Sequence, residues 1–155
     1  MENSLIQPFN GDIAVEMNTT LMLDAAARGD LEEAEKFGLR IPQVDMRVVH
    51  LFGPKFCIRE LHIPAGTFLI GHAHKEPLAN MLVKGKIRVC SDGVWSDLEA
   101  PFFFVGKPGR KAAIALSDCI WQNILVTDET DPAEIEKLFV VHSEQWTAAQ
   151  QGEHK

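Results

Sequence analysis

The chain of 155 residues contains no tyrosine, few cysteines and no long hydrophobic run. The lack of tyrosine removes a common phenolic general acid. Cys57, Cys90 and Cys119 are odd in number, widely spaced and without a C-x-x-C pair, so they predict buried thiols in a reducing compartment rather than a disulfide framework. No segment approaches the roughly 18 apolar residues of a membrane span, and the N-terminus lacks the basic and apolar parts of a signal peptide. We therefore expect a cytoplasmic protein that is neither secreted nor bound to a membrane.

The short motifs of several enzyme classes are also missing. The sequence has no G-x-S-x-G nucleophile elbow and no GxxxxGK[ST] phosphate loop, and none of the cysteines lies in an identifiable activating setting. Nucleophilic catalysis is therefore not expected, and no catalytic residue is predicted.

Charge is distributed unevenly along the chain, which carries a formal net charge of −7. Residues 1–46 have a net charge of −6, residues 47–111 of +5, and residues 112–155 of −6. The acidic total argues against general nucleic-acid binding, because neutralising phosphates requires a basic surface. A basic middle between acidic flanks instead favours self-assembly into a homo-oligomer, or capture of a small anionic ligand.

The first part of the chain, residues 1–43, is expected to form a helical hairpin. Thr19 or Thr20 is a candidate N-cap of a first helix that ends at Gly29. Asp30 then caps a second short helix.

Residues 44–126 change to short apolar or alternating runs separated by Gly, Pro and Asp, a pattern typical of a β-sandwich or barrel of about eight to ten strands. After them, residues 127–155 predict an acidic helix, capped by Asp131 with Pro132 in its first position, and a tail of helix or coil. One compact domain is expected, with helical additions before and after the barrel.

The clearest chemical pattern lies between Gly66 and Gly85. His72 and His74 are two residues apart in an expected strand, so they should point to one face and converge on one ion. The spacing G-x5-H-x-H, with a Pro-Ala-Gly turn before it and the closing glycine after it, resembles the first motif of the cupin superfamily. The resemblance extends over residues 44–126 and implies a mainly β, cupin-type double-stranded β-helix, or jelly roll, whose interior holds a divalent metal or a small ligand.

The sequence departs from the cupin pattern at two ligand positions. Leu78 or Ala79 stands where the family has a glutamate. In the second motif Pro108 and Gly109 are adjacent, and the expected histidine falls near Ala112. A divalent transition metal requires three or more protein ligands in a defined geometry. The two histidines alone would therefore bind weakly.

A third ligand must complete any metal site built on the two histidines. The predicted metal ligands are His72, His74 and Glu76, and the cofactor would be a divalent ion of Fe, Mn, Ni or Zn. Asn80, Glu60, His62 or a partner subunit are the alternatives. Strand alternation argues against Glu60 and His62 as ligands. The other face of their strand, with Cys57, Arg59, Leu61 and Ile63, has more apolar residues and is expected to be the buried one, so Glu60 and His62 should point outward.

Other polar and aromatic residues are candidates for ligand binding. Lys84, Lys86 and Arg88 alternate along a hairpin and should share a face, either as a solvated sheet surface or as a site for an anion. The predicted ligand-binding residues are Asn80, Lys84, Lys86, Arg88 and Trp121.

The order of several short elements also resembles small stand-alone cupins encoded by bacteriophages. These elements are Pro64-Ala65-Gly66, His74-Lys75, Glu99-Ala100-Pro101, Pro108-Gly109, Trp121 and the acidic segment from Thr127 to Asp131. The function predicted first is a non-enzymatic, phage-associated module for binding or virion assembly with a degraded metal site, oligomeric or bound to other viral structural proteins. The alternatives are a metal-dependent isomerase or dioxygenase that uses His72 and His74, and a sugar- or anion-binding jelly roll.

Overall fold

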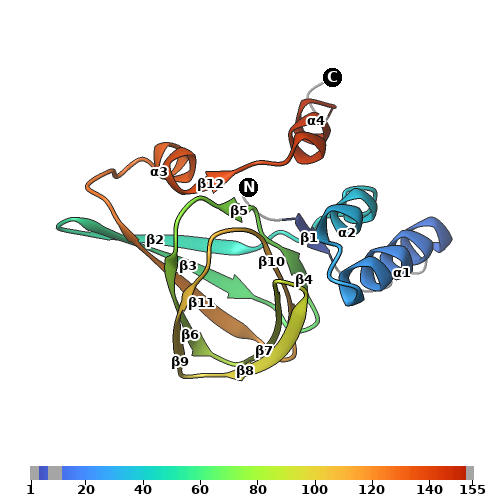
Figure 1. Cartoon of the computed structure of the whole chain (residues 1–155), viewed down its shortest axis with the longest axis horizontal. Helices are drawn as coiled ribbons and strands as arrows, with labels where there is room; N and C mark the ends of the chain where they lie inside the picture. The colour runs from blue at the N-terminus through green and yellow to red at the C-terminus, as the bar shows by residue number, and fades with distance from the viewer. Residues whose placement is uncertain (1–3, 7–11, 153–155) are drawn as a thin grey trace.

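Two antiparallel sheets face each other in the structure, a computed structural model that describes residues 4–6 and 12–152 (Figure 1). One sheet has the order β1 (Ser4–Ile6), β4 (Phe68–Ile70), β10 (Lys111–Ala115), β7 (Lys86–Ser91) and β8 (Val94–Glu99). The other has the order β2 (Arg47–Gly53), β3 (Phe56–Ile63), β11 (Cys119–Val126), β6 (Leu78–Lys84) and β9 (Phe102–Gly106). The predicted fold class, a mainly β jelly roll with helices at both ends, is confirmed.

The N-terminal helix starts earlier than the sequence predicts. Helix α1 (Ile13–Ala27) is capped by Asp12, whose carboxylate accepts hydrogen bonds from the next helical amides at 2.8 and 3.2 Å. The prediction of Thr19 or Thr20 as the cap is wrong, because the helix already begins at Ile13 and both threonines lie inside it, where the following amides bond to carbonyls of the preceding turn. Thr19 instead donates its hydroxyl proton to the carbonyl of Val15 within the helix.

The second helix of the hairpin begins as predicted. In α2 (Leu31–Gly38), the Asp30 side chain accepts a hydrogen bond from the Glu33 amide at 3.1 Å. Between the two helices, Gly29 adopts a φ of +77°. The helix-capping side chain of Asp30 and the positive φ of Gly29 therefore determine the turn between α1 and α2.

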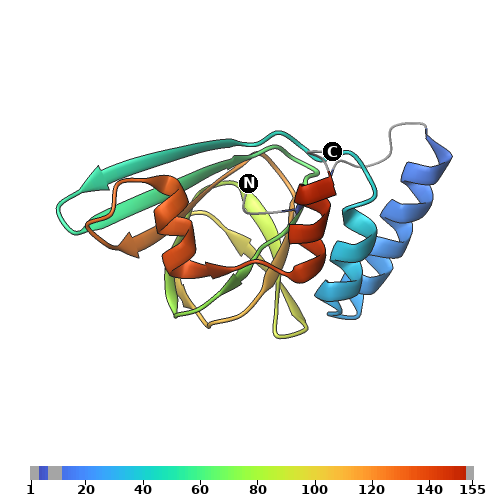
Figure 2. The same cartoon turned by 90° about the horizontal axis from the view of Figure 1, so that it is seen from above.

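The residues after the barrel form an extension that we call the C-terminal arm, residues 131–152. Asp131 caps α3 (Pro132–Phe139) as predicted, and a short strand β12 (Val140–Val141) pairs with β5 (Ala73–His74) before α4 (Glu144–Gly152). Figure 2 shows α4 beside α2. The last three residues of the predicted tail lie outside the described residues. None of the helices that the structure describes has the length and apolar character needed to cross a bilayer.

Apolar side chains form a core between the sheets and two further clusters beneath the helices. The core between the sheets includes Leu61, Ile63, Leu82, Ile87, Val89, Ala113, Ala115 and Cys119. Helices α1 and α2 cover the outer side of β4, β10 and β7 through a cluster that includes Met22, Ala25, Ala34, Ile70 and Cys90, while Ile135 of α3 packs on Cys57, Leu78 and Leu125. All three cysteines are buried free thiols, as predicted.

The turn between β6 and β7 depends on Gly85, the closing glycine of the first motif. Its φ is +93°, and a Cβ built there would lie 2.3 Å from the carbonyl oxygen of Asp118. We expect Gly85→Ala to lower the free energy of unfolding by about 2 kcal/mol, because both the backbone conformation and the close approach exclude a side chain. Urea denaturation would measure the loss. Gly93→Ala is the control, since φ there is also positive, at +75°, but nothing lies within 4 Å of an added Cβ.

Candidate functional site

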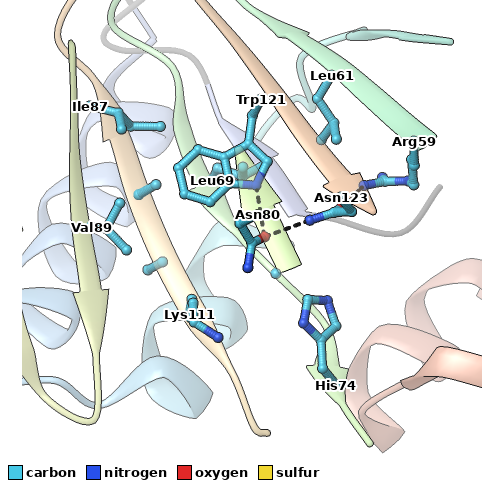
Figure 3. A pocket seen from close by; sticks show the side chains of 13 residues that line it. Arg59, Leu61, Leu69, His74, Asn80, Ile87, Val89, Lys111, Trp121 and Asn123 are labelled. Atoms are coloured by element: carbon cyan, nitrogen blue, oxygen red, sulfur yellow. Dashed lines mark hydrogen bonds between the residues drawn. The ribbon is translucent and has the colours of Figure 1, made fainter. Parts of the chain in front are cut away.

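A cavity of about 80 Å³ lies between the two sheets (Figure 3). Its apolar wall is formed by residues of both sheets, among them Leu61, Leu69, Ile87, Val89 and Ala113. Its polar wall consists of Arg59, His74, Asn80, Lys111, Trp121 and Asn123. The candidate site is therefore the inside of the barrel, with one apolar and one polar wall.

One row of neighbouring residues across β3, β11 and β6 supplies half of the polar wall. Arg59 pairs with Asn123, and Asn123 pairs with Asn80, in the register of the three strands. Directly opposed residues of an antiparallel sheet project to the same face. The pattern of β3 confirms the prediction that Arg59 belongs to its inward face, because Cys57, Leu61 and Ile63 are buried on the same side.

Hydrogen bonds join this row into one network. An Arg59 guanidinium nitrogen donates to the Asn123 side-chain oxygen at 3.1 Å, and the Asn123 amide donates to the Asn80 oxygen at 2.8 Å. The Trp121 indole donates to the same Asn80 oxygen at 3.1 Å, while the Asn80 amide donates to the Leu78 carbonyl at 2.8 Å. The network fixes the orientation of both amides and the indole, so the polar wall is preorganised.

His74 and Lys111 face this network across the cavity (Figure 3). Burial, with the nearby charges of Lys111 and Arg59, lowers the pKa of His74 to about 4. The ring is therefore neutral at pH 7, and its buried Nδ1 has no hydrogen-bond partner among the residues that the structure describes. Burial also lowers the pKa of Lys111, partly opposed by the charge of Asp92. Its Nζ donates one hydrogen bond, at 3.0 Å, to the Lys107 carbonyl.

The interior does not fit the divalent metal that the cupin resemblance implies. Of the described residues that line the cavity, His74 alone has a side chain that commonly binds transition metals. The positive charges of Arg59 and Lys111 would repel a cation bound next to His74. No carboxylate belongs to the described wall of this cavity. The arrangement instead offers positive charge and hydrogen-bond donors to an anion.

The predicted metal residues lie in different surroundings. Gly71 and His72 are outside the strands, between β4 and β5, so the two-residue alternation on which the prediction relied is interrupted there. The His72 ring, 2% exposed, contacts the rings of His142 and Trp146 with centroids 4.6 and 4.7 Å apart. His74 lines the barrel cavity, and Glu76 is exposed.

A different set of groups could hold a metal ion. One ligand atom each of His72, Glu136 and His142 lies within 4.8 Å of the others. A search of the described residues for three or more His, Cys, Asp or Glu side chains with this spacing gives His72, Glu136 and His142. Of the predicted metal ligands, His74 and Glu76 are therefore not in this group.

The predicted ligand-binding residues divide between the cavity and the surface. Asn80 and Trp121 line the cavity. Lys84, Lys86 and Arg88 are exposed; Arg88 pairs with Asp97 at 2.7 Å, and Lys86 with Glu99 at 3.8 Å. Glu60 and His62 form a pair at 2.9 Å on the outer side of β3, as strand alternation predicted.

Sequence reasoning did not single out several residues that the structure brings to these sites. Lys111 and Asn123 could have been found by alternation, since Lys111 shares a face with Ala113 and Ala115, and Asn123 with Trp121. Glu136 and His142 carry no such signal, because they lie more than sixty positions along the chain from His72.

Comparisons with known proteins address the fold alone. No protein-family model matches the sequence, and no curated protein matches it significantly. An RmlC-like cupin from Shewanella frigidimarina is 21% identical over 56% of this chain and 79% of its own, with a TM-score of 0.47. An uncharacterized protein with a double-stranded β-helix domain from Klebsiella pneumoniae is 13% identical (59% and 85% covered, TM-score 0.47). An acetylacetone dioxygenase from Acinetobacter johnsonii is 19% identical (68% and 74% covered, TM-score 0.44).

Proposed function

We propose that this protein is a non-enzymatic binding module whose barrel cavity takes up a small carboxylate. The observation that carries the proposal is that Lys111 and a neutral His74 border the same cavity as the Arg59–Asn123–Asn80 network, so that its polar wall offers positive charge and hydrogen-bond donors. Charged side chains are rarely placed in a protein interior unless a group of opposite charge accompanies them. A bound anion would supply such a group beside Lys111, whose Nζ donates its one hydrogen bond among the described residues to a backbone carbonyl.

The size of the cavity favours a small ligand over a sugar ring. An engineered apolar cavity of about 150 Å³ binds benzene, whereas this one measures about 80 Å³. A carboxylate of a few heavy atoms fits that space, with its oxygens toward Lys111 and His74 and its carbon atoms against the apolar wall. Charge-assisted hydrogen bonds of this kind are about twice as strong as neutral ones.

Catalysis is not part of the proposal, because the wall that the structure describes holds no serine, cysteine or carboxylate to act together with His74 or Lys111. Its titratable side chains are those of Arg59, His74 and Lys111. Asn80, Asn123 and Trp121 are occupied in hydrogen bonds with one another. The wall is suited to hold an anion in place.

Replacement of Lys111 tests the carboxylate site. We expect Lys111→Met to weaken the binding of acetate by about 10- to 100-fold, the usual loss for a hydrogen bond to a charged group. The Trp121 indole proton, which lies at the cavity wall, gives an NMR signal that reports binding directly, and a titration with formate, acetate and malonate would measure the affinities. Thermal unfolding of the variant should be unchanged or higher in temperature, because burial of the ammonium group opposes folding.

Lys107→Met is the matched control, since it makes the same change four residues away on a side chain that is 82% exposed. Its acetate affinity should equal that of the unmodified protein. Failure of all three carboxylates to shift the Trp121 indole signal would refute the proposed site, and so would equal affinities of the two lysine variants.

A further inference from the structure

A second polar cluster lies outside the barrel cavity, between the barrel and the C-terminal arm. His72 comes from the segment between β4 and β5, Glu136 from α3, and His142 from the residues after β12. Nε2 of His142 lies 2.7 Å from a Glu136 carboxylate oxygen. Three chain segments that are distant in sequence therefore bring two imidazoles and a carboxylate together.

The spacing of these groups suits a transition-metal ion. Two ligand atoms of a tetrahedral zinc ion with bonds of about 2.1 Å lie roughly 3.4 Å apart. The three ligand atoms are within 4.8 Å of one another, so no pair needs to close by more than about 1.4 Å, and the His142–Glu136 pair at 2.7 Å needs to open slightly. Side-chain rotation can supply such a movement without a change in the backbone. Two histidines and one glutamate with an open position form the ligand set of catalytic zinc sites and of non-haem iron sites.

The surroundings hold these side chains in place. Trp146 of α4 packs against both imidazole rings, with centroids 4.7 Å from His72 and 4.4 Å from His142. Supporting groups that fix the orientation of ligand side chains are a regular feature of metal sites.

One ion pair anchors both sides of the cluster. Arg110 donates to the carbonyl of Gly71, the residue before His72, at 2.8 Å, and it also pairs with the buried Glu35. Glu35 in turn accepts a hydrogen bond from Ser143, the residue after His142. The same two charged side chains thus hold the barrel segment and the arm at a fixed distance.

We propose that His72, Glu136 and His142 bind one divalent transition-metal ion, such as Zn²⁺, and that the ion fastens the C-terminal arm to the barrel. The side chains of His142 and Glu136 are 33% and 21% exposed, which leaves a path for the ion and room for a water ligand on the solvent side. None of the three ligands lines the carboxylate cavity, although a neighbouring pocket that includes His72 and Glu136 shares Arg59, His74 and Asn123 with it. Neither proposal depends on the other.

Cobalt binding tests the proposed metal site, because Co²⁺ bound to histidine and carboxylate ligands has visible absorption bands. Untagged protein should bind one Co²⁺ per chain, and Zn²⁺ should displace it. We expect His142→Ala and Glu136→Gln each to weaken binding by at least about 100-fold, since even outer-shell partners of metal sites cost 10- to 100-fold when removed. Both side chains are partly exposed, so these variants should fold.

The His62–Glu60 pair provides a matched control within the same chain. Its atoms are 2.9 Å apart, and its side chains are 28% and 19% exposed, close to the values of His142 and Glu136, but it has no third ligand among the described residues. His62→Ala should therefore leave Co²⁺ binding unchanged. The proposal is overturned if Co²⁺ and Zn²⁺ do not saturate a site, or if His62→Ala and His142→Ala reduce the affinity equally.

A second measurement separates metal binding from metal-dependent closure of the arm. Zn²⁺ should slow limited proteolysis within residues 131–152 of the unmodified protein and should not do so in His142→Ala. The acetate titration of the Trp121 indole should be the same in both proteins, because the cavity wall does not include His142. Saturable binding without any protection of the arm would refute the role of the ion as a fastener.

Discussion

Glu35→Ala is expected to lower the free energy of unfolding by about 3–5 kcal/mol, the usual loss when one partner of a buried ion pair is removed. Glu35 is fully buried on α2, and its carboxylate accepts hydrogen bonds from Arg110, Ser143 and Gln145. Burial alone would raise the pKa of this carboxyl group, but these donors and the Arg110 charge lower it below its ordinary value. The group is therefore ionised at neutral pH, and its removal leaves the Arg110 charge, 18% exposed, without this partner.

A substitution on the same helix gives the control for Glu35→Ala. The Glu33 side chain is 38% exposed and pairs with Lys36 at 3.6 Å. Because solvent screens such surface pairs, Glu33→Ala should cost less than about 1 kcal/mol. Urea denaturation of both variants would measure the difference. Limited proteolysis should also show earlier cleavage in α4 for Glu35→Ala, and equal stability losses in the two variants would contradict this role of Glu35.

The Glu35–Arg110 pair also bears on the charge blocks of the sequence. Glu35 belongs to the acidic N-terminal block and Arg110 to the basic middle, yet the two side chains meet within one chain. Some of the opposite charges that could have paired between copies of the chain thus pair within one copy, where they position the helices on the barrel. Association with another copy or with a viral partner stays a prediction, and a salt titration monitored by light scattering would test it.

The strands could be predicted because their signals are local. The short apolar or alternating runs of residues 44–126 coincide with strands of the two sheets. Alternation within β3 also gave the correct face for Arg59 and for the Glu60–His62 pair. Burial on one face imposes a period of two on a strand, and a run of eight residues is long enough to show it.

The parts that could not be predicted depend on contacts between distant segments. Strands β1 and β12 are too short for a periodic signal, and they form by pairing with β4 and β5. The metal prediction assumed an unbroken strand through His72, whereas the strand stops at Ile70 and resumes at Ala73. Only the three-dimensional path of the arm brings Glu136 near this break. Local periodicity therefore located the barrel and one wall of its cavity, but not the second polar cluster.

Acidification from pH 6.5 to pH 4 is expected to destabilise the protein by up to about 3 kcal/mol through His74 alone. The pKa of His74 falls from 6.5 to about 4 on folding. Between these values the unfolded chain binds the proton and the folded chain does not, so a decrease in pH favours the unfolded state. The destabilisation caused by His74 occurs at a higher pH than the one caused by Glu35. The pKa of Glu35 is lowered on folding, so its protonation destabilises the protein only below about pH 4.5, the ordinary pKa of a glutamate.

His74→Gln should flatten the dependence of stability on pH between 6.5 and 4, because glutamine keeps a polar side chain but does not titrate. Urea denaturation at a series of pH values would show the change in slope, and an NMR titration of the His74 ring should give a pKa near 4. Saturating acetate should raise that pKa, since a carboxylate beside the ring offsets the charges of Lys111 and Arg59 and favours the protonated form. A pKa near 6.5 without acetate would contradict the burial of His74 between the cations, and a pKa that acetate does not change would place the anion elsewhere.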